Sequence, residues 1–166
     1  MATDKNLQDA FAGESQANRK YLAFAKQADA DGFPQVARLF RAASAAETVH
    51  AHAHLRVMGG IKSTAENVKA AIEGEGYEFQ KMYPQFLAEA EAEKNQGAAI
   101  SFKYALAVEQ IHHHLYTDAL NAVQGGKDLA TSSVMVCPVC GNTLLGQAPE
   151  KCPICSTPGA KFFSVK

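Results

Sequence analysis

Four segments in the first two thirds of the chain carry glutamate and histidine residues at a spacing typical of metal ligands on helices. Glu-x-x-His occurs twice, Glu-x-x-Glu occurs once, and a further glutamate precedes them. The candidate ligands are Glu14, Glu47, His50, Glu75, Glu78, Glu109 and His112. Residues three positions apart share a face of an α-helix, so each pair directs two ligands the same way. A Glu-x-x-His motif from each of two helices is the ligand pattern of a di-iron carboxylate site in a helical bundle.

The hydrophobic pattern predicts a mainly α-helical protein with a four-helix bundle. Each expected helix has an inward apolar stripe, and glycine or proline marks most of its ends. The expected helices cover residues 3–31, 34–58, 75–94 and 98–123. Residues 61–74 stay open, because periodicity allows them either to cross the bundle or to begin the third helix. A short helix from Thr64 to about Glu73 is expected there, and Gly74 and Gly76 weaken its continuity with the third helix.

The first two expected helices form a hairpin that brings two of the ligands together. Glu14 lies seventeen residues before Asp31, and Glu47 lies sixteen residues after it. Antiparallel helices would therefore hold Glu14 and Glu47 at the same depth. Glu78 and Glu109 have a similar separation, which predicts a second hairpin that supplies the other half of the site.

Length and charge limit the domain organisation and the classes of partner. The 166 residues are enough for a bundle and a second small unit. We expect the bundle over 1–126, a linker over 127–134 and a metal-binding domain over 135–166. The net charge of −1 gives no indication of a nucleic-acid or membrane surface. A signal-peptide pattern and a long apolar run are both lacking, so the sequence predicts a cytoplasmic protein without a membrane span.

Four cysteines near the C-terminus form two Cys-x-x-Cys pairs. They are Cys137, Cys140, Cys152 and Cys155. In a chain that is not secreted, this spacing favours a tetrahedral metal site over disulfides. The thiolates alone would accept zinc or iron. Iron is favoured here, with zinc as a possible substitute, because a di-iron neighbour must be re-reduced and a redox-inert ion could not relay electrons.

The carboxylates themselves require cations. Five carboxylates in an apolar core would repel one another and resist ionisation, whereas two iron ions would bring the site close to neutrality. Carboxylate and imidazole ligands together suit iron or manganese better than zinc or copper. The alternative is a solvated helix face at each motif, which is plausible for one motif but much less so for all of them together.

Other side chains near these motifs have less certain roles. Tyr21 and Tyr83 lie two turns from Glu14 and Glu75, so each could hydrogen-bond a ligand or could simply be a core tyrosine. His54 shares a face with His50 and could support it. We expect three further histidines on the surface, namely His52, His113 and His114.

Several of these segments resemble the rubrerythrins, and the likeness covers nearly the whole chain. The matching segments are Glu14-Ser-Gln-Ala, Ala-Glu47-Thr-Val-His50, Gly-Glu75-Gly-Tyr-Glu78 with Met-Tyr83-Pro, Glu109-Gln-Ile-His112 and the two cysteine pairs. The resemblance implies a ferritin-like four-helix bundle with a non-haem di-iron site, followed by a rubredoxin-like iron domain.

The resemblance also implies specific roles. Residues 61–74 would form a long crossover between the two hairpins. His50 and Glu78 would alternate on one iron as its oxidation state changes, and Tyr21 and Tyr83 would lie beside the di-iron site. One departure concerns Ser156, which stands where the second cysteine loop usually has glycine. Serine must therefore adopt a positive φ there or avoid it.

The expected function is that of a peroxide reductase. Hydrogen peroxide would be reduced to water at the di-iron site, and electrons would return one at a time through the iron held by the cysteines. No Gly-x-Gly-x-x-Gly motif follows a strand, so the electron donor is expected to be an NAD(P)H-dependent reductase or a rubredoxin-type protein. The alternatives are a ferroxidase or iron-storage protein and, outside redox chemistry, a zinc-ribbon adaptor on a plain helical bundle.

Helix length also predicts a mode of assembly. Glu109 lies about fifteen residues before the end of the fourth helix, roughly 22 Å at helical rise. A short linker would then leave the cysteine module far from the di-iron ligands of its own chain. We therefore expect a head-to-tail homodimer in which the cysteine-bound iron of one chain faces the di-iron site of the other.

Overall fold

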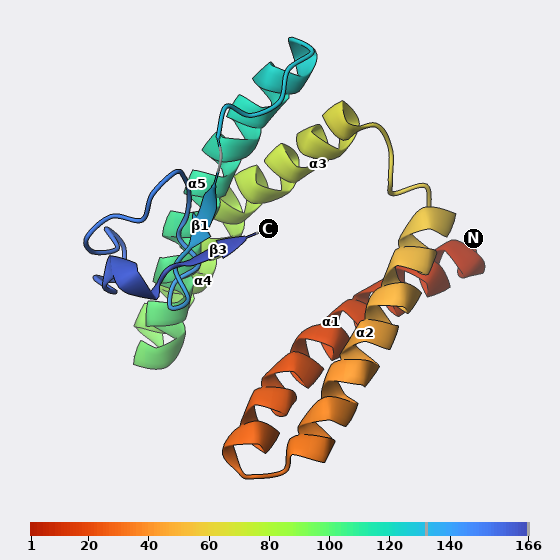
Figure 1. Cartoon of the computed structure of the whole chain (residues 1–166). Coiled ribbons are helices and arrows are strands. Elements are labelled where there is room, and N and C mark those ends of the chain that lie inside the picture. Colours follow the sequence, from red (N-terminus) through yellow and green to blue (C-terminus); the bar gives the residue numbers. More distant parts are fainter. Residues whose placement is uncertain (132, 166) are drawn as a thin grey trace. The chain divides into compact units, whose positions relative to one another are not determined.

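The computed structural model describes residues 1–131 and 133–165 and separates into two compact units, Met1–Lys62 and Ser63–Lys166 (Figure 1). Ser132, in the expected linker, and Lys166, at the end of the expected second domain, lie outside the described residues. Each unit contains one helical hairpin, and the second unit also contains a small β-sheet. The predicted fold class, mainly helical with a small C-terminal metal-binding domain, is confirmed.

The first unit is an antiparallel hairpin of α1 (Ala2–Ala30) and α2 (Pro34–Val57). Gly32, with φ of +83°, makes the turn between them. Pro34 is the first residue of α2, where a backbone N–H would have no hydrogen-bond partner within the helix, so proline is tolerated there. Ala25, Ala28 and Ala37 are buried between the helices, with Phe40 packed against them. These small side chains let the two backbones approach closely. The antiparallel hairpin that the sequence predicts for these two helices is confirmed.

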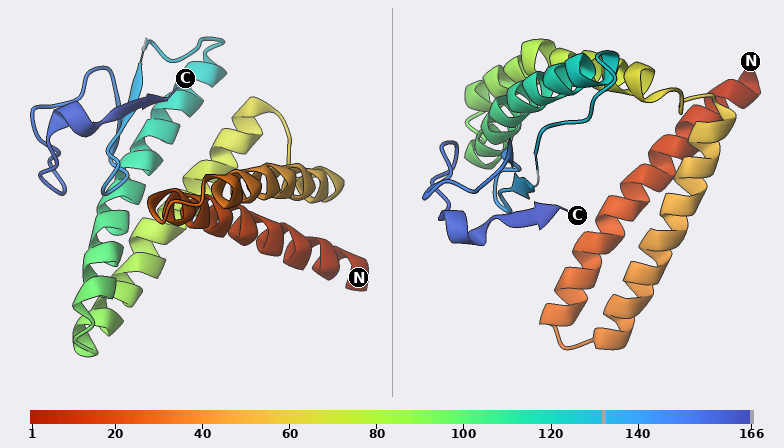
Figure 2. Two further views of the ribbon diagram at one scale, coloured as in Figure 1. Left: turned by 60° about the horizontal axis from the view of Figure 1, so that its bottom comes forward. Right: turned by 45° about the horizontal axis from the view of Figure 1, so that its top comes forward.

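The second hairpin pairs a continuous helical segment with α5 (Gln96–Gln124). The segment consists of α3 (Thr64–Tyr77), the π-helical turn η1 (Glu78–Met82) and α4 (Tyr83–Ala92), and both α3 and α4 contact α5 (Figure 2). Ser63 caps α3 by accepting a hydrogen bond from the N–H of Glu66, and Asn95 caps α5 in the same way.

The expected crossover over residues 61–74 is wrong. Residues from Thr64 onward are already helix packed along α5, and α3 continues through Gly74 and Gly76 to Tyr77. Gly76 belongs in the helix because of its position against α5. A Cβ atom at Gly76 would lie 3.3 Å from the ring of His113, so glycine allows a close approach that outweighs its low helix propensity.

The π-helical turn has a local cause in the sequence. Tyr83 donates its backbone N–H to the carbonyl of Glu78, five residues earlier. Pro84, the next residue, has no N–H and cannot continue the regular α-helical ladder. A wider turn accommodates this interruption without ending the helix, and such turns are frequent at functional sites.

The C-terminal part of the second unit is a three-stranded antiparallel sheet. Its strands β1 (Val134–Val136), β2 (Thr143–Leu145) and β3 (Phe163–Val165) lie in the order β2-β1-β3. A 3-10 turn, η2 (Gly159–Lys161), precedes β3. Cys137, Cys152 and Phe162 form its buried centre. After α5 the chain turns back beside that helix, and β2 contacts it (Figure 1).

No helix within residues 1–131 and 133–165 combines the length and apolar character needed to cross a membrane.

Candidate metal centres

The first hairpin brings Glu14, Glu47 and His50 together. One possible ligand atom from each lies within 4.8 Å of the others. The Nδ1 atom of His50 is 3.0 Å from a carboxylate oxygen of Glu47, one turn earlier on α2. Glu14 and Glu47 are partly buried, whereas His50 is exposed. Glu14 and Glu47 therefore lie at the same depth in the hairpin, as expected. We call Glu14, Glu47 and His50 half-site one.

A hydrogen-bond network beside half-site one sets the register of its two helices. Asn18, one turn after Glu14, donates its side-chain amide to the hydroxyls of Ser44 and Thr48 and to the carbonyl of Ser44, at 2.7–3.0 Å. The hydroxyl of Ser44 in turn donates to the carbonyl of Asn18. Sequence reasoning did not find this network. The available signal was a polar triplet placed within the inward stripes of both helices.

The second hairpin brings Glu75, Glu109 and His112 together, and we call them half-site two. Their possible ligand atoms also lie within 4.8 Å of one another. His112 Nδ1 is 2.7 Å from an oxygen of Glu109 and 3.8 Å from an oxygen of Glu75. Glu75 comes from α3, and the other two come from α5. All three are partly buried.

Glu78 and Tyr83 lie at the edge of half-site two. Glu78 is outside the group of three, but burial raises its pKa, and so does the negative charge of Glu75. Burial also raises the pKa of Tyr83, and the carboxylates of Glu78, Glu109 and Glu75 raise it further. The Tyr83 phenol therefore keeps its proton beside this carboxylate cluster.

Half-site two is electrostatically strained in a way that a cation would relieve. Burial raises the pKa of Glu75, and the neighbouring Glu109 raises it further, while His112 opposes the shift. Carboxylates that resist ionisation because they are crowded together fit a divalent or trivalent metal ion, which would favour their charged forms. The residues present therefore suit a metal centre.

This crowding predicts a pH-dependent stability for the metal-free protein. Because the pKa of Glu75 is raised on folding, the folded state binds its proton more tightly than the unfolded state does. Stability should therefore fall as pH rises above the unfolded value of 4.5. Glu75→Gln, which removes the buried charge, is expected to raise the free energy of unfolding at pH 7 and with it the melting temperature.

Thermal unfolding of chelator-treated protein at pH 5, 6 and 7 measures this effect. Glu73→Gln, on the exposed side of the same helix, is the matched control and should change little. A Glu75→Gln variant that melts below the wild type at pH 7 would contradict the assignment of strain to this carboxylate.

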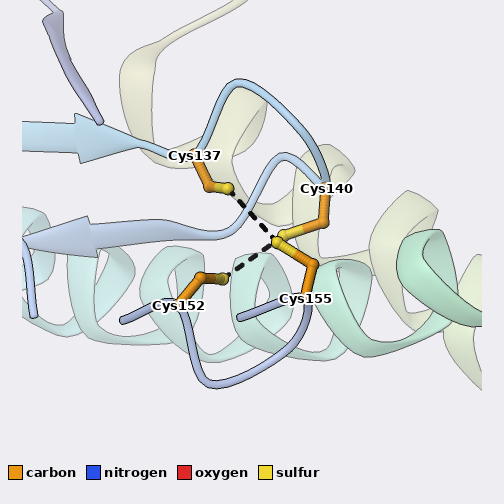
Figure 3. A group of neighbouring side chains, drawn as sticks. All are labelled: Cys137, Cys140, Cys152 and Cys155. Atoms are coloured by element: carbon orange, nitrogen blue, oxygen red, sulfur yellow. Dashed lines mark hydrogen bonds between the residues drawn. The ribbon is translucent and has the colours of Figure 1, made fainter. Parts of the chain in front are cut away.

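The four cysteines converge on one point (Figure 3). Cys137 Sγ is 3.6 Å from Cys155 Sγ, and Cys140 Sγ is 3.5 Å from Cys152 Sγ. A disulfide would need about 2.0 Å. A tetrahedral metal ion with bonds of about 2.3 Å has sulfur–sulfur edges of about 3.8 Å. The arrangement therefore fits a single four-coordinate ion.

Two loops of similar geometry carry these cysteines. Gly141 donates its N–H to the carbonyl of Cys137, and Ser156 donates its N–H to the carbonyl of Cys152. Gly141 has φ of +84°, and Ser156 has φ of +61° at the matching position. Serine therefore adopts the left-handed conformation at the position where the resemblance implies glycine, which answers the question that the sequence left open about Ser156.

Buried polar side chains contact two of the sulfurs. The amide of Asn142 approaches Cys152 Sγ at 3.8 Å, and the hydroxyl of Thr157 lies 3.1 Å from Cys155 Sγ. Burial opposes ionisation of Cys155, but hydrogen bonds from the side chain and backbone of Thr157 lower its pKa to about 6. Burial raises the pKa of Cys140 instead. Sequence reasoning missed Asn142 and Thr157. The available signal was a polar residue two positions after each cysteine pair.

The remaining histidines and Tyr21 have mixed outcomes. His52 and His114 are exposed, as expected. The expectation that His113 is a surface residue is wrong, because its ring packs edge-on against Phe79 and close to Gly76. Tyr21 packs against Phe24 and Phe40 in the first hairpin. Within the described part of the chain, no hydrogen bond of Tyr21 or His54 to a half-site residue is found.

The cysteine module lies against its own second hairpin. His112 Nε2 is 2.9 Å from the hydroxyl oxygen of Thr143, the first residue of β2. The expectation that the module lies far from the ligands of its own chain is therefore wrong for half-site two. Counting residues to the end of α5 gave the wrong distance because the chain reverses after the helix and returns along it.

Comparisons with known proteins agree with these features. The rubrerythrin family profile matches residues 5–120, and the profile of the rubrerythrin rubredoxin-like domain matches residues 135–163. Rubrerythrin-2 of Clostridium acetobutylicum is 35% identical, with 94% of this chain and 92% of that protein covered. Nigerythrin of Nitratidesulfovibrio vulgaris is 35% identical, with 97% and 85% covered. A solved structure described as the fully reduced, all-ferrous state of nigerythrin superposes with a TM-score of 0.59 at 34% identity, covering 98% of this chain and 86% of that one.

Proposed function

Because the chain belongs to the rubrerythrin family, whose members are iron-dependent oxidoreductases, we propose that it reduces hydrogen peroxide to water at a di-iron centre. Half-sites one and two, with Glu78, would together supply the seven ligands of that centre. The four cysteines would hold one further iron, with zinc as a possible substitute. The bundle domain would cover 1–126 and the iron domain 135–166.

The observation that carries this proposal is the pairing of two kinds of metal site in one chain. A Glu-x-x-His pair and a further glutamate converge in each hairpin, and four thiolates converge in the module that contacts the second hairpin. A ferroxidase would need the first kind of site, and a zinc adaptor would need the second. A peroxidase that is re-reduced by an external donor needs both.

The protein side chains have distinct tasks in this proposal. Iron supplies the electrons for cleavage of the O–O bond when it is bound. The carboxylates of Glu75 and Glu109, which lie 3.8 Å and 2.7 Å from His112 Nδ1, would offset the charge of a metal ion bound there. The Tyr83 phenol, protonated beside them, is placed to donate a hydrogen bond or a proton to an oxygen atom at this centre. Tyr21 is proposed to do the same from half-site one.

The proposed partners follow from what the chain itself provides. We propose an NAD(P)H-dependent reductase or a rubredoxin-type protein as the electron donor, and the cytoplasm as the location. We also propose a homodimer. A head-to-tail arrangement is not required for it, because the cysteine module already contacts half-site two of its own chain. Sedimentation of the iron-loaded protein at micromolar concentration tests the dimer, and a monomer would exclude it.

Metal analysis and rapid kinetics test the proposed function. Iron bound at both kinds of site, and oxidation of the reduced protein by hydrogen peroxide much faster than by dioxygen, are the expected results. Faster oxidation by dioxygen, with iron taken up into a large assembly, would indicate a ferroxidase. Zinc alone, bound by the cysteines, would indicate the adaptor.

A further inference from the structure

One hydroxyl group connects the cysteine loop to half-site two. The Oγ1 atom of Thr143 donates a hydrogen bond to the carbonyl of Gly141 at 3.0 Å, and it lies 2.9 Å from His112 Nε2. A threonine hydroxyl has a single proton. Because that proton goes to Gly141, the contact with His112 requires the Nε2–H of the imidazole to be the donor.

This contact sets the tautomer of His112. With the proton on Nε2, the lone pair of Nδ1 is directed toward the oxygens of Glu109 and Glu75, at 2.7 Å and 3.8 Å. A metal ion shared with those carboxylates would be bound through that atom. Partners of the second ring nitrogen commonly fix the ring orientation and basicity of metal-binding histidines.

His112, one partner in this contact, also lines a groove between α5 and the first cysteine loop. A groove of about 480 Å³ separates parts of α5 from the first cysteine loop and reaches Glu109, His112 and Cys140. Gly141 directly follows Cys140 and holds the loop through its own N–H bond to Cys137. From the Cys140 sulfur, a short run of covalent bonds and two hydrogen bonds therefore lead to the His112 ring.

We propose that Thr143 is a positioning residue that holds His112 in the Nε2–H tautomer and forms the link through which electrons pass from the four-cysteine site to half-site two. This inference rests on the proposed function. In the step concerned, one electron leaves a ferrous ion at the cysteines, which becomes ferric, and reduces one ferric ion at the glutamate and histidine ligands to ferrous. His112 and Thr143 keep their protons throughout.

Two substitutions at Thr143 separate the hydrogen bond from the shape of the side chain. Thr143→Val keeps the volume and removes the hydroxyl, whereas Thr143→Ser keeps the hydroxyl. In the full-length iron-loaded protein, fully reduced and then mixed with peroxide, oxidation of the cysteine-bound iron is expected to slow by about 10- to 100-fold in Thr143→Val and to recover in Thr143→Ser. Equal iron content confirms that the variants are loaded alike.

A second readout does not depend on activity. In the full-length protein loaded with diamagnetic zinc and labelled with ¹⁵N-histidine, the Nε2–H resonance of His112 should be protected from exchange in the wild type and Thr143→Ser. It should be lost or shifted in Thr143→Val. A Thr143→Val variant with wild-type oxidation kinetics, or with an unchanged His112 spectrum, would overturn the inference. If the wild type itself fails to react with peroxide, the proposed function falls, and the imidazole spectrum still decides the tautomer.

Discussion

Cys152→Ser is expected to lower steady-state peroxide turnover by at least about 100-fold while sparing the first reaction of chemically reduced protein with peroxide. Cys152 is only 2% exposed, and its sulfur faces Cys140 across the four-cysteine site. Serine oxygen is a poor replacement for a thiolate that binds iron, so the one-electron relay would be lost. The glutamate and histidine ligands would be left intact. Losing a metal ligand should exceed the 10- to 100-fold effects of residues that only support ligands.

Stopped-flow mixing separates the two reactions. Dithionite-reduced protein mixed with one equivalent of peroxide reports the first reaction, and donor-driven turnover reports the relay. The wild-type protein with zinc at the cysteines is the control, because it keeps the fold of the module and removes its redox activity. It should behave like Cys152→Ser. Turnover of the zinc-loaded protein at the rate of the iron-loaded protein would show that the module is structural.

Glu109→Gln is expected to lower the first reaction with peroxide by at least about 100-fold. Glu109 lies 2.7 Å from His112 Nδ1, and its charge raises the pKa values of Glu75 and Tyr83. Glutamine has the same shape without the charge, so it would not offset the charge of a metal ion or bind it as an anionic ligand. The pKa of Tyr83 should also fall toward its ordinary value, which ultraviolet titration of the metal-free protein can follow.

The control for Glu109→Gln is Glu91→Gln. Glu91 lies on the exposed face of α4, and its substitution removes the same charge from the chain. Wild-type rates are expected for that variant. If Glu109→Gln bound a full complement of iron and reacted with peroxide at the wild-type rate, Glu109 would not be a ligand.

The local parts of both half-sites could be predicted from sequence because they depend on helix periodicity alone. Pairs at i and i+3 share a face wherever the helix forms, and Asp31-Gly32 fixes the turn that aligns Glu14 with Glu47. The four-cysteine site was predictable for a similar reason, since each Cys-x-x-Cys loop is a short local structure whose backbone bonds are set within five residues.

The errors concern places where contacts between distant residues override a local signal. Gly74 and Gly76 are poor helix formers, but the packing of α3 on α5 and the close approach of Gly76 to His113 keep the helix continuous. The direction of the chain after α5 depends on β2 meeting α5, with Thr143 at His112. Neither contact has a periodic pattern, so residue counting along α5 placed the cysteine module too far away.

The wide turn at Glu78–Met82 rotates the side chains of α4 about the helix axis relative to those of α3. One surplus residue in a helix offsets everything beyond it by about 100° relative to an uninterrupted spiral. Glu75 before the turn and Tyr83 after it can therefore both face α5, although a regular α-helix would place them on different faces. An uninterrupted α-helix would place Tyr83, eight residues after Glu75, about 80° around the helix from it. The wide turn is therefore what keeps the tyrosine beside the carboxylate cluster.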